Sequence, residues 1–223
     1  MNRVLIGISC FIVSIGFSQT IGKYDLSSNM LIDLGSRSSA AAINVQGSQY
    51  FNETYLPSKV SGYENETIPL RYNAAQDEME FQKAGQLYHI PKTQNMTVTH
   101  ITNQKVYEYI DYIDKEDKVS GYLAVLHKGE QHSLYKREQI KYIPAKEASN
   151  SYDRDRPAQY KKADDTYFIK TGDVIENFPK NRKELLRKFS NKKTQLSDFI
   201  KKNKISFSQE GDLIKLVIFL NTL

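Results

Sequence analysis

Two of the four histidines of the chain, His127 and His132, lie close together in the sequence with a carboxylate, Glu130, between them. Histidine and carboxylate side chains are ligands that zinc accepts. If Gly129 and Glu130 form the centre of a type II′ turn, His127 faces His132 across a β-hairpin. One such pair supplies two ligands, whereas structural zinc sites use four protein ligands and catalytic sites three. We therefore interpret the segment as a solvated hairpin tip. A turn centred on Lys128 and Gly129 is the alternative, and it would separate the histidines.

Other catalytic signatures are missing from the sequence. It has no nucleophile elbow, phosphate-binding loop, dinucleotide motif or zinc-protease helix. Ser133 and Lys136 have the spacing of a serine–lysine pair, but in a predicted strand residues three apart point to opposite faces. His89 and His100 also lie in predicted strands without an acidic or histidine neighbour at ligand spacing, so we predict structural roles for both. The acidic residues at 111–117 lack the spacing of an EF-hand and indicate a hairpin turn. We expect no enzyme, no cofactor and no metal.

The first residues predict a secretory signal peptide, residues 1–18. A positively charged start precedes an apolar stretch, residues 4–17, that is too short to span a bilayer comfortably. We expect cleavage before Gln19, and a retained membrane anchor is the alternative. Cys10 is the single cysteine of the chain, so the mature protein would have no disulfide, thiolate metal site or thiol nucleophile.

Basic residues are concentrated in residues 180–204. This segment has ten basic and two acidic side chains, a net charge of +8, whereas the whole chain carries +5 and the remainder therefore −3. The candidates for binding an anionic surface, such as lipid headgroups, are Arg182, Lys183, Arg187, Lys188, Lys192, Lys193, Lys201 and Lys202. The simpler interpretation is the solvated face of amphipathic helices, because the apolar stripe of the segment is intact. Nucleic acid is not expected, since the protein is exported and no aromatic pattern accompanies the charge.

Apolar and polar side chains alternate from about residue 40 to residue 178, with turn residues between the runs. This pattern predicts about eight to eleven short antiparallel strands in a curved sheet or partial barrel. We assign them to a β domain of residues 19–178, with residues 145–159 as a loop because they hold few large apolar side chains. The last hairpin is expected to turn at residues 171–173.

Beyond Pro179 the apolar periodicity becomes helical, which predicts about three helices in a segment of residues 179–223. Asn181, Ser190 and Ser208 are the expected N-caps. The last helix has a wide apolar stripe that includes Leu213, Leu216, Val217 and Leu220. Such a surface needs a cover, either the sheet, the other helices or a partner. The expected fold class is α+β, an antiparallel β meander followed by C-terminal helices packed on it.

Three segments resemble a group of uncharacterised secreted proteins of the Bacteroidota: "GSQYFNETYLP" (residues 47–57), "IPLRYNAAQDEMEF" (68–81) and the ending "LSDFIKKNKISFSQEGDLIKLVIFLNTL". The resemblance covers most of the mature chain and implies an exported protein, but it implies no activity, ligand or catalytic residue. The predicted helical C-terminus differs from the β-sandwich sorting domain of type IX secretion substrates. We therefore expect the periplasm or the outer membrane, with the extracellular space as the alternative.

These observations favour a non-catalytic cell-envelope protein that binds another protein. A sheet rich in tyrosine, of which the chain has 15, offers flat faces and edges suited to recognition. The alternative is a periplasmic lipid or lipoprotein carrier, in which a curved sheet closes over an acyl chain and helices cover its open side. The expected partner is an envelope protein, with a lipid or an anionic membrane surface as the other possibility.

Overall fold

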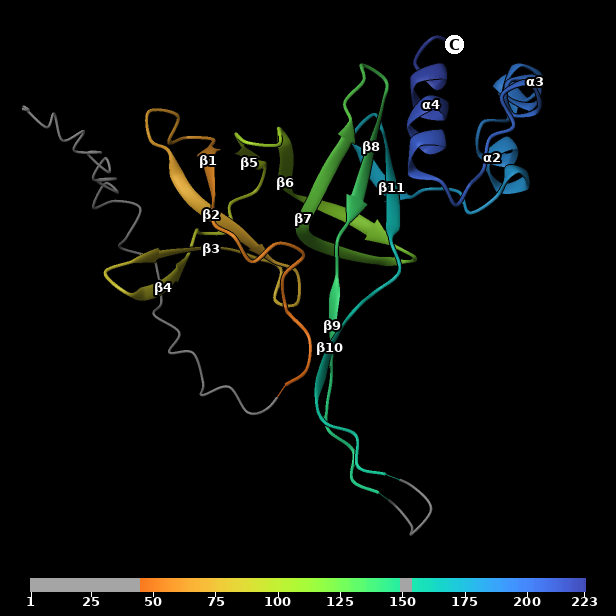
Figure 1. The fold of residues 1–223 in the computed structure, drawn as a ribbon. Helices are drawn as coiled ribbons and strands as arrows, with labels where there is room; N and C mark the ends of the chain where they lie inside the picture. Colours follow the sequence, from red (N-terminus) through yellow and green to blue (C-terminus); the bar gives the residue numbers. More distant parts are fainter. Residues whose placement is uncertain (1–44, 149–153) are drawn as a thin grey trace, which may run out of the picture.

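Figure 1 shows the computed structural model of the chain, which describes residues 45–148 and 154–223. The predicted signal peptide, Cys10 and the cleavage site before Gln19 lie outside these residues. Within them, strands come first and helices follow, so the predicted α+β class with C-terminal helices is confirmed. None of the helices in this part is long and apolar enough to cross a lipid bilayer.

The described residues form twelve strands, one more than the upper end of the predicted range. They are β1 (Leu56–Val60), β2 (Ile68–Asn73), β3 (Glu78–Lys83), β4 (Gln86–His89), β5 (Met96–His100), β6 (Lys105–Asp114), β7 (Asp117–His127), β8 (His132–Arg137), β9 (Ile140–Ile143), β10 (Gln159–Lys162), β11 (Thr166–Thr171) and β12 (Val174–Asn177). The last of these hairpins turns where predicted, because Thr171 pairs with Val174 and leaves Gly172 and Asp173 between the strands.

The sheet is not the purely antiparallel meander that the sequence predicts. Ten strands pair in the order β12-β11-β8-β7-β6-β5-β1-β2-β3-β4, and β12 also pairs with β6 in parallel, through Glu176 and Ile113. The strands β6, β7, β8, β11 and β12 thus close into a five-stranded barrel. In a closed meander with an odd number of strands the first and last strands run in the same direction, which explains the parallel pair. The alternation of apolar and polar residues within each strand cannot reveal that the barrel closes.

The barrel strands are buried on both faces. The interior is filled by side chains of alternate residues, namely Ile110, Tyr112, Leu123, Tyr135, Phe168 and Ile175. Tyr107, Tyr122 and Ala124 point to the other face of β6 and β7, where they join a core with the apolar residues of β1–β5. Successive strand residues point to opposite faces. Both faces of these strands are covered by an apolar core, and tyrosine side chains contribute to each core.

The helices are α2 (Arg182–Lys188), α3 (Lys193–Asn203) and α4 (Glu210–Leu220), with a 3₁₀ turn, η1 (Ser190–Lys192), before α3. Asn181 caps α2 as predicted, because its Oδ1 accepts a hydrogen bond from the backbone N of Glu184 at 3.0 Å. The predicted caps Ser190 and Ser208 are wrong: the residues before α3 and α4 are Lys192 and Gln209, and neither makes a side-chain cap. Ser190 is the first residue of the 3₁₀ turn. The apolar periodicity of the sequence does not distinguish such a turn from the first turn of an α-helix.

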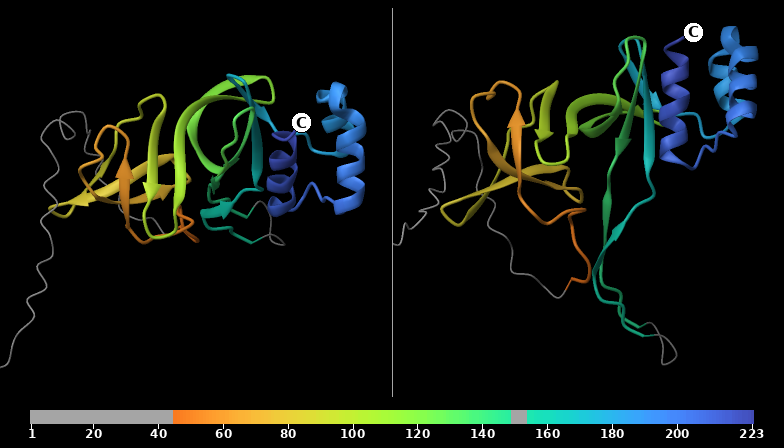
Figure 2. Two further views of the ribbon diagram at one scale, coloured as in Figure 1. Left: turned by 90° about the horizontal axis from the view of Figure 1, so that it is seen from above. Right: turned by 45° about the horizontal axis from the view of Figure 1, so that its top comes forward.

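The three helices cover the outside of the barrel, with α4 next to the strands and α2 and α3 beyond it (Figure 2). Their apolar faces form one core with Leu134 of β8 and Ile169 of β11. The buried residues of α4 are Leu213, Leu216, Val217 and Leu220. The sheet and the other helices therefore provide the cover that this stripe requires.

Strands β9 and β10 form a separate two-stranded ribbon that projects away from the rest of the protein (Figures 1 and 2). The described residues of the predicted loop, 145–148 and 154–159, continue this ribbon, and Lys146 and Arg156 still pair there. At its base, Gln46 pairs with Gln159. Tyr142 and Ile143 of β9 belong to none of the three apolar cores, whereas Ile140, at the start of β9, is buried in the core with β1–β5.

Candidate functional site

The structure does not form the predicted histidine pair. Val125 pairs with Tyr135 and His127 with Leu134, with a β-bulge between Val125 and His127. His132 instead pairs with Thr171 of β11, and its Nδ1 lies 3.2 Å from the Thr171 hydroxyl. The predicted register, with His127 facing His132, is therefore wrong.

Asn221, at the end of α4, binds the hairpin tip in the observed register. Its Oδ1 accepts hydrogen bonds from the backbone N of Gln131 and of His132, at 3.0 and 2.9 Å, and its Nδ2 donates to the carbonyl of His132 at 2.9 Å. A Cβ on Gly129 would come within 2.4 Å of Asn221 Nδ2. The hairpin tip is thus a docking point for the C-terminal helix.

A buried serine and histidine also meet, Ser58 of β1 and His100 of β5. The Ser58 hydroxyl is 2.7 Å from His100 Nδ1 and also 2.7 Å from the carbonyl of Leu56, to which it donates. His100 Nδ1 is then the donor toward Ser58, so the imidazole does not remove the proton of the serine. Both residues are buried, which leaves the hydroxyl no access to a substrate. This contact joins β1 to β5, where Ser58 and His100 are paired residues.

Burial has an electrostatic consequence for His100. Desolvation, together with the nearby charge of Lys105, lowers the pKa of His100 from 6.5 to about 4, while Glu138 opposes the shift. Glu138 is itself held by Lys105 Nζ at 2.7 Å and by the Tyr107 hydroxyl at 2.6 Å. The imidazole is therefore neutral near pH 7 in the folded protein.

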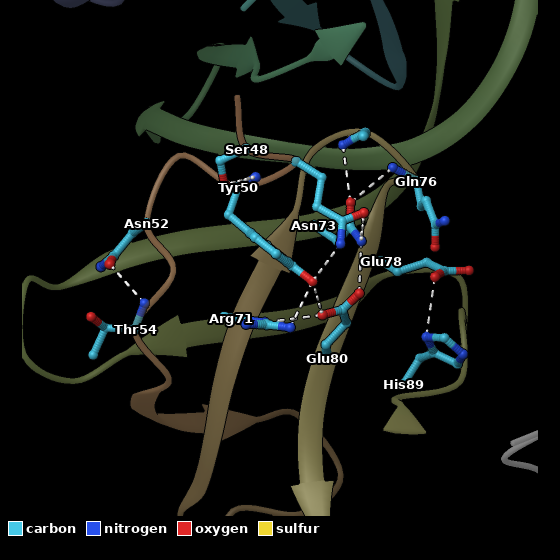
Figure 3. Close-up of polar contacts among 12 residues, drawn as sticks. Ser48, Tyr50, Asn52, Thr54, Arg71, Asn73, Gln76, Glu78, Glu80 and His89 are labelled. Carbon is cyan, nitrogen blue, oxygen red and sulfur yellow. Dashed lines mark hydrogen bonds and ion pairs between the residues drawn. The ribbon is translucent and has the colours of Figure 1, made fainter. Parts of the chain in front are cut away.

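A second cluster surrounds Glu80 of β3, whose side chain is almost fully buried (Figure 3). Its Oε2 accepts hydrogen bonds from the Tyr50 hydroxyl at 2.8 Å and from Arg71 Nε at 3.0 Å, and its Oε1 accepts one from Asn73 Nδ2 at 2.7 Å. The Arg71 guanidinium stacks on the ring of Tyr50, 3.9 Å from the ring centroid, and on that of Tyr55, at 4.5 Å. Burial, and then the contact with Glu80, raises the pKa of Tyr50, so Tyr50 remains a donor.

His89 of β4 lies beside the same carboxylate. Strand pairing sets His89 opposite Glu80, and Glu78 is on the same face of β3 because it lies two residues away. His89 Nδ1 is 3.1 Å from Glu78 Oε2 (Figure 3). The expectation that His89 has no acidic neighbour is therefore wrong. The spacing Glu-x-Glu followed by a tight turn and a histidine is the signal in the sequence that would have identified this contact.

The mouth of the barrel holds a third polar group. Glu108 accepts from Lys128 Nζ at 2.6 Å and from the Tyr135 hydroxyl at 2.9 Å. These residues line a hollow of about 420 Å³ whose other walls include Asp111, Lys170 and further polar side chains. A hollow of this composition does not suit an acyl chain, because burying charged groups against hydrocarbon is costly.

The candidate anionic-surface residues lie on α2, η1 and α3. Five of them are exposed: Lys183, Arg187, Lys193, Lys201 and Lys202. The other three are partly buried. Arg182 contacts the hydroxyl of Ser197, and Lys188 contacts Glu176 of β12. Five of the eight predicted basic residues therefore face solvent, and the other three are partly buried in the protein.

The ribbon exposes side chains on nearly all sides. Every residue from Lys141 to Ala148 is exposed, and among them Tyr142 and Ile143 are large apolar side chains, 54% and 38% exposed. The Tyr142 ring lies 5.4 Å from that of Tyr160 on β10. A hollow of about 470 Å³ runs along the ribbon, between walls that include Pro144 and Pro157.

Comparison with known proteins identifies no relative of this chain. No family model, no curated protein and no solved structure matches the chain.

Proposed function

We propose that this is a non-catalytic protein of the cell envelope that binds another protein with its β9–β10 ribbon. The exposure of the ribbon carries the proposal. An isolated two-stranded ribbon is at best marginally stable in water, and large exposed apolar side chains on it favour association. Tyr142 and Ile143 are such side chains, and they contribute to no apolar core of the structure.

The ribbon also offers a free backbone edge. Among the residues that the structure describes, β9 pairs only with β10, and the base of β10 pairs with Gln46 on its other side. The outer edge of β9 from Lys141 to Ile143 is therefore open to an added strand, which binds through main-chain hydrogen bonds.

Charge indicates the chemistry of the partner. Residues 141–162 contain more basic than acidic side chains, six against three. The basic ones are Lys141, Lys146, Arg154, Arg156, Lys161 and Lys162, and the acidic ones are Glu147, Asp153 and Asp155. We therefore propose an extended, acidic segment of the partner as the ligand. A membrane surface fits less well, since lipids cannot continue a strand ladder.

The lipid-carrier alternative receives less support. The interior of the barrel is filled by its own side chains, including the fully buried Tyr135 and Phe168. The hollow at its mouth is lined largely by polar and charged groups.

The test is site-specific photo-crosslinking in the native envelope, with the crosslinker at position 142. The control position is Val174 on β12, which is 49% exposed but belongs to the barrel and not to the ribbon. We expect protein crosslinks from position 142 and none of the same species from position 174. Lipid adducts alone, or the same protein from both positions, would contradict the proposal.

Binding to the purified partner then decides the role of the ribbon. The double variant Tyr142→Ser/Ile143→Ser should bind about tenfold or more weakly than the wild type, because exposed aromatic side chains commonly carry interface energy. The matched control, Val174→Ser, should bind normally. Equal affinity for all three proteins would rule out the ribbon as the binding surface.

A further inference from the structure

The cluster around Glu80 contains the combination of side chains that a divalent metal ion requires. Glu78, Glu80 and His89 each contribute one possible ligand atom, and these atoms lie within 4.8 Å of one another. They come from two paired strands, β3 and β4, whose register fixes their mutual positions. Figure 3 shows the His89 ring beside the Glu78 carboxylate, and the neighbouring Glu80 carboxylate beside Arg71 and Tyr50.

The separation of two of these atoms is close to that of ligands on one ion. Zinc binds nitrogen and oxygen at about 2.0–2.2 Å, so adjacent ligand atoms of a tetrahedral site are about 3.3–3.6 Å apart. Glu78 Oε2 and His89 Nδ1 are 3.1 Å apart. His89 Nδ1 is buried and makes no aligned hydrogen bond. A metal ion between the two side chains would satisfy this nitrogen.

Glu80 is already oriented by its neighbours. The Tyr50 hydroxyl and Arg71 Nε occupy its Oε2, but Oε1 accepts one hydrogen bond, from Asn73, and keeps a second lone pair. Ligating carboxylates in metal sites are typically held in this way by a surrounding shell of donors. The hydrogen bonds therefore hold the Glu80 carboxylate in place and leave one lone pair of Oε1 for a third ligand contact.

The ligand types favour a cation. Glu78 and Glu80 bring two carboxylates, and Arg71 pairs with Glu80. An imidazole that binds a metal ion is neutral and offers a lone pair. The mixed nitrogen and oxygen ligands suit zinc and similar transition metals, whereas calcium and magnesium prefer oxygen alone.

We propose that Glu78, Glu80 and His89 bind one divalent transition-metal ion of the zinc type, with water completing the coordination. The site lies on the β3–β4 hairpin and is separate from the proposed partner surface on the β9–β10 ribbon. Three protein ligands and an open position allow moderate affinity, so the ion would stabilise the hairpin and the segment around Tyr50 that packs against it.

Zinc binding to the full chain, prepared without an affinity tag and treated with a chelator, tests this proposal. Isothermal titration calorimetry should show one zinc ion per chain, and zinc should raise the melting temperature. His89→Gln and Glu78→Gln should each weaken zinc binding about tenfold or more, since each loses a ligand or its charge. Circular dichroism of the two variants, matching that of the wild type, would establish that they are folded.

The matched control is His127→Gln, because His127 lies on β7 and pairs with Leu134. This variant should bind zinc with the affinity of the wild type. No binding at micromolar zinc would overturn the proposal and leave the cluster as an internal ion-pair network. Wild-type affinity in folded His89→Gln would equally overturn it and assign the zinc to another part of the chain.

Discussion

The barrel with its helices and the β9–β10 ribbon are built from the same kinds of residue but differ in what surrounds them. In the barrel, Tyr135 is fully buried and its hydroxyl bonds to Glu108. On the ribbon, Tyr142 is exposed over half of its surface. The same aromatic side chain therefore contributes to the stability of the first region and is available for contact in the second.

This difference separates folding from binding in the protein. Substitutions in the barrel and its helical cover should change the free energy of unfolding, whereas substitutions of the exposed Tyr142 and Ile143 on the ribbon should leave it nearly unchanged. The four predictions below test this separation, from the largest expected effect to the smallest.

Removal of residues 211–223 should have the largest effect. Leu213, Leu216, Val217 and Leu220 are at most 1% exposed, and burial of each contributes roughly 1.5–3 kcal/mol. Their sum, about 6–12 kcal/mol before entropy is subtracted, is comparable to the net stability of a whole domain. We expect an aggregating or unfolded product in size-exclusion chromatography. A monomer with the melting temperature of the wild type would show that α4 is dispensable for folding.

Acid should destabilise the protein through His100. The folded pKa of about 4 lies below the ordinary value of 6.5, so between these values the unfolded chain binds a proton that the folded protein does not. Stability from this group is therefore complete above pH 6.5 and is lost as the pH falls toward 4. The loss should be about 2–3 kcal/mol.

Urea unfolding at several pH values measures this contribution. His100→Gln should remove it, so that the variant loses less stability than the wild type between pH 7 and pH 4. Lys105 and Glu138, the charged groups that act on His100, are unchanged in this comparison. Parallel pH profiles for the two proteins would show that His100 is not the titrating group.

Asn221→Ala should cost about 1–3 kcal/mol, because it leaves the backbone N of Gln131 and of His132 without their acceptor. Asn203→Ala is the matched control, since Asn203 makes one exposed hydrogen bond, to the carbonyl of Phe199. The free energy of unfolding measured in urea should fall for the first variant and change by less than about 0.5 kcal/mol for the second. Equal effects would mean that Asn221 does not anchor the hairpin tip.

Tyr142→Ser/Ile143→Ser should have the smallest effect on stability, within about 0.5 kcal/mol of the wild type, because neither side chain belongs to a buried core. The melting temperature of the purified protein tests this expectation. A clear decrease in the melting temperature would show that these side chains pack on the protein in solution. The ribbon would then contribute to folding and not only to binding.

The candidate site shows where reading the sequence was insufficient. The sequence predicts a structural role for His89 because it has no acidic neighbour along its own strand, whereas its acidic neighbours lie across a hairpin. The pairing of Glu80 with His89 follows from the short turn between β3 and β4. The order of residues along this hairpin was therefore enough to predict the contact. The contact of Tyr50 with Glu80 could not be predicted in this way, because Tyr50 comes from a segment 30 residues away, whereas Arg71 pairs with Glu80 across the β2–β3 hairpin.

The sequence by itself determined the local elements of this protein. Alternating apolar residues indicated the strands, Gly172 and Asp173 the last hairpin turn, and Asn181 the start of α2. Each depends on interactions between residues close in the chain, such as the cap that joins Asn181 to Glu184. Residue type and spacing are therefore enough to predict them.

Only the tertiary structure decided which face of each strand is buried, where the barrel closes and how the opening hairpin is registered. The parallel pair of Glu176 with Ile113 joins strands that are distant in sequence. The hairpin tip at His132 is bound by Asn221, 89 residues away. Such contacts gain free energy only when the whole chain has brought both partners together, and for this reason no local pattern in the sequence contains them.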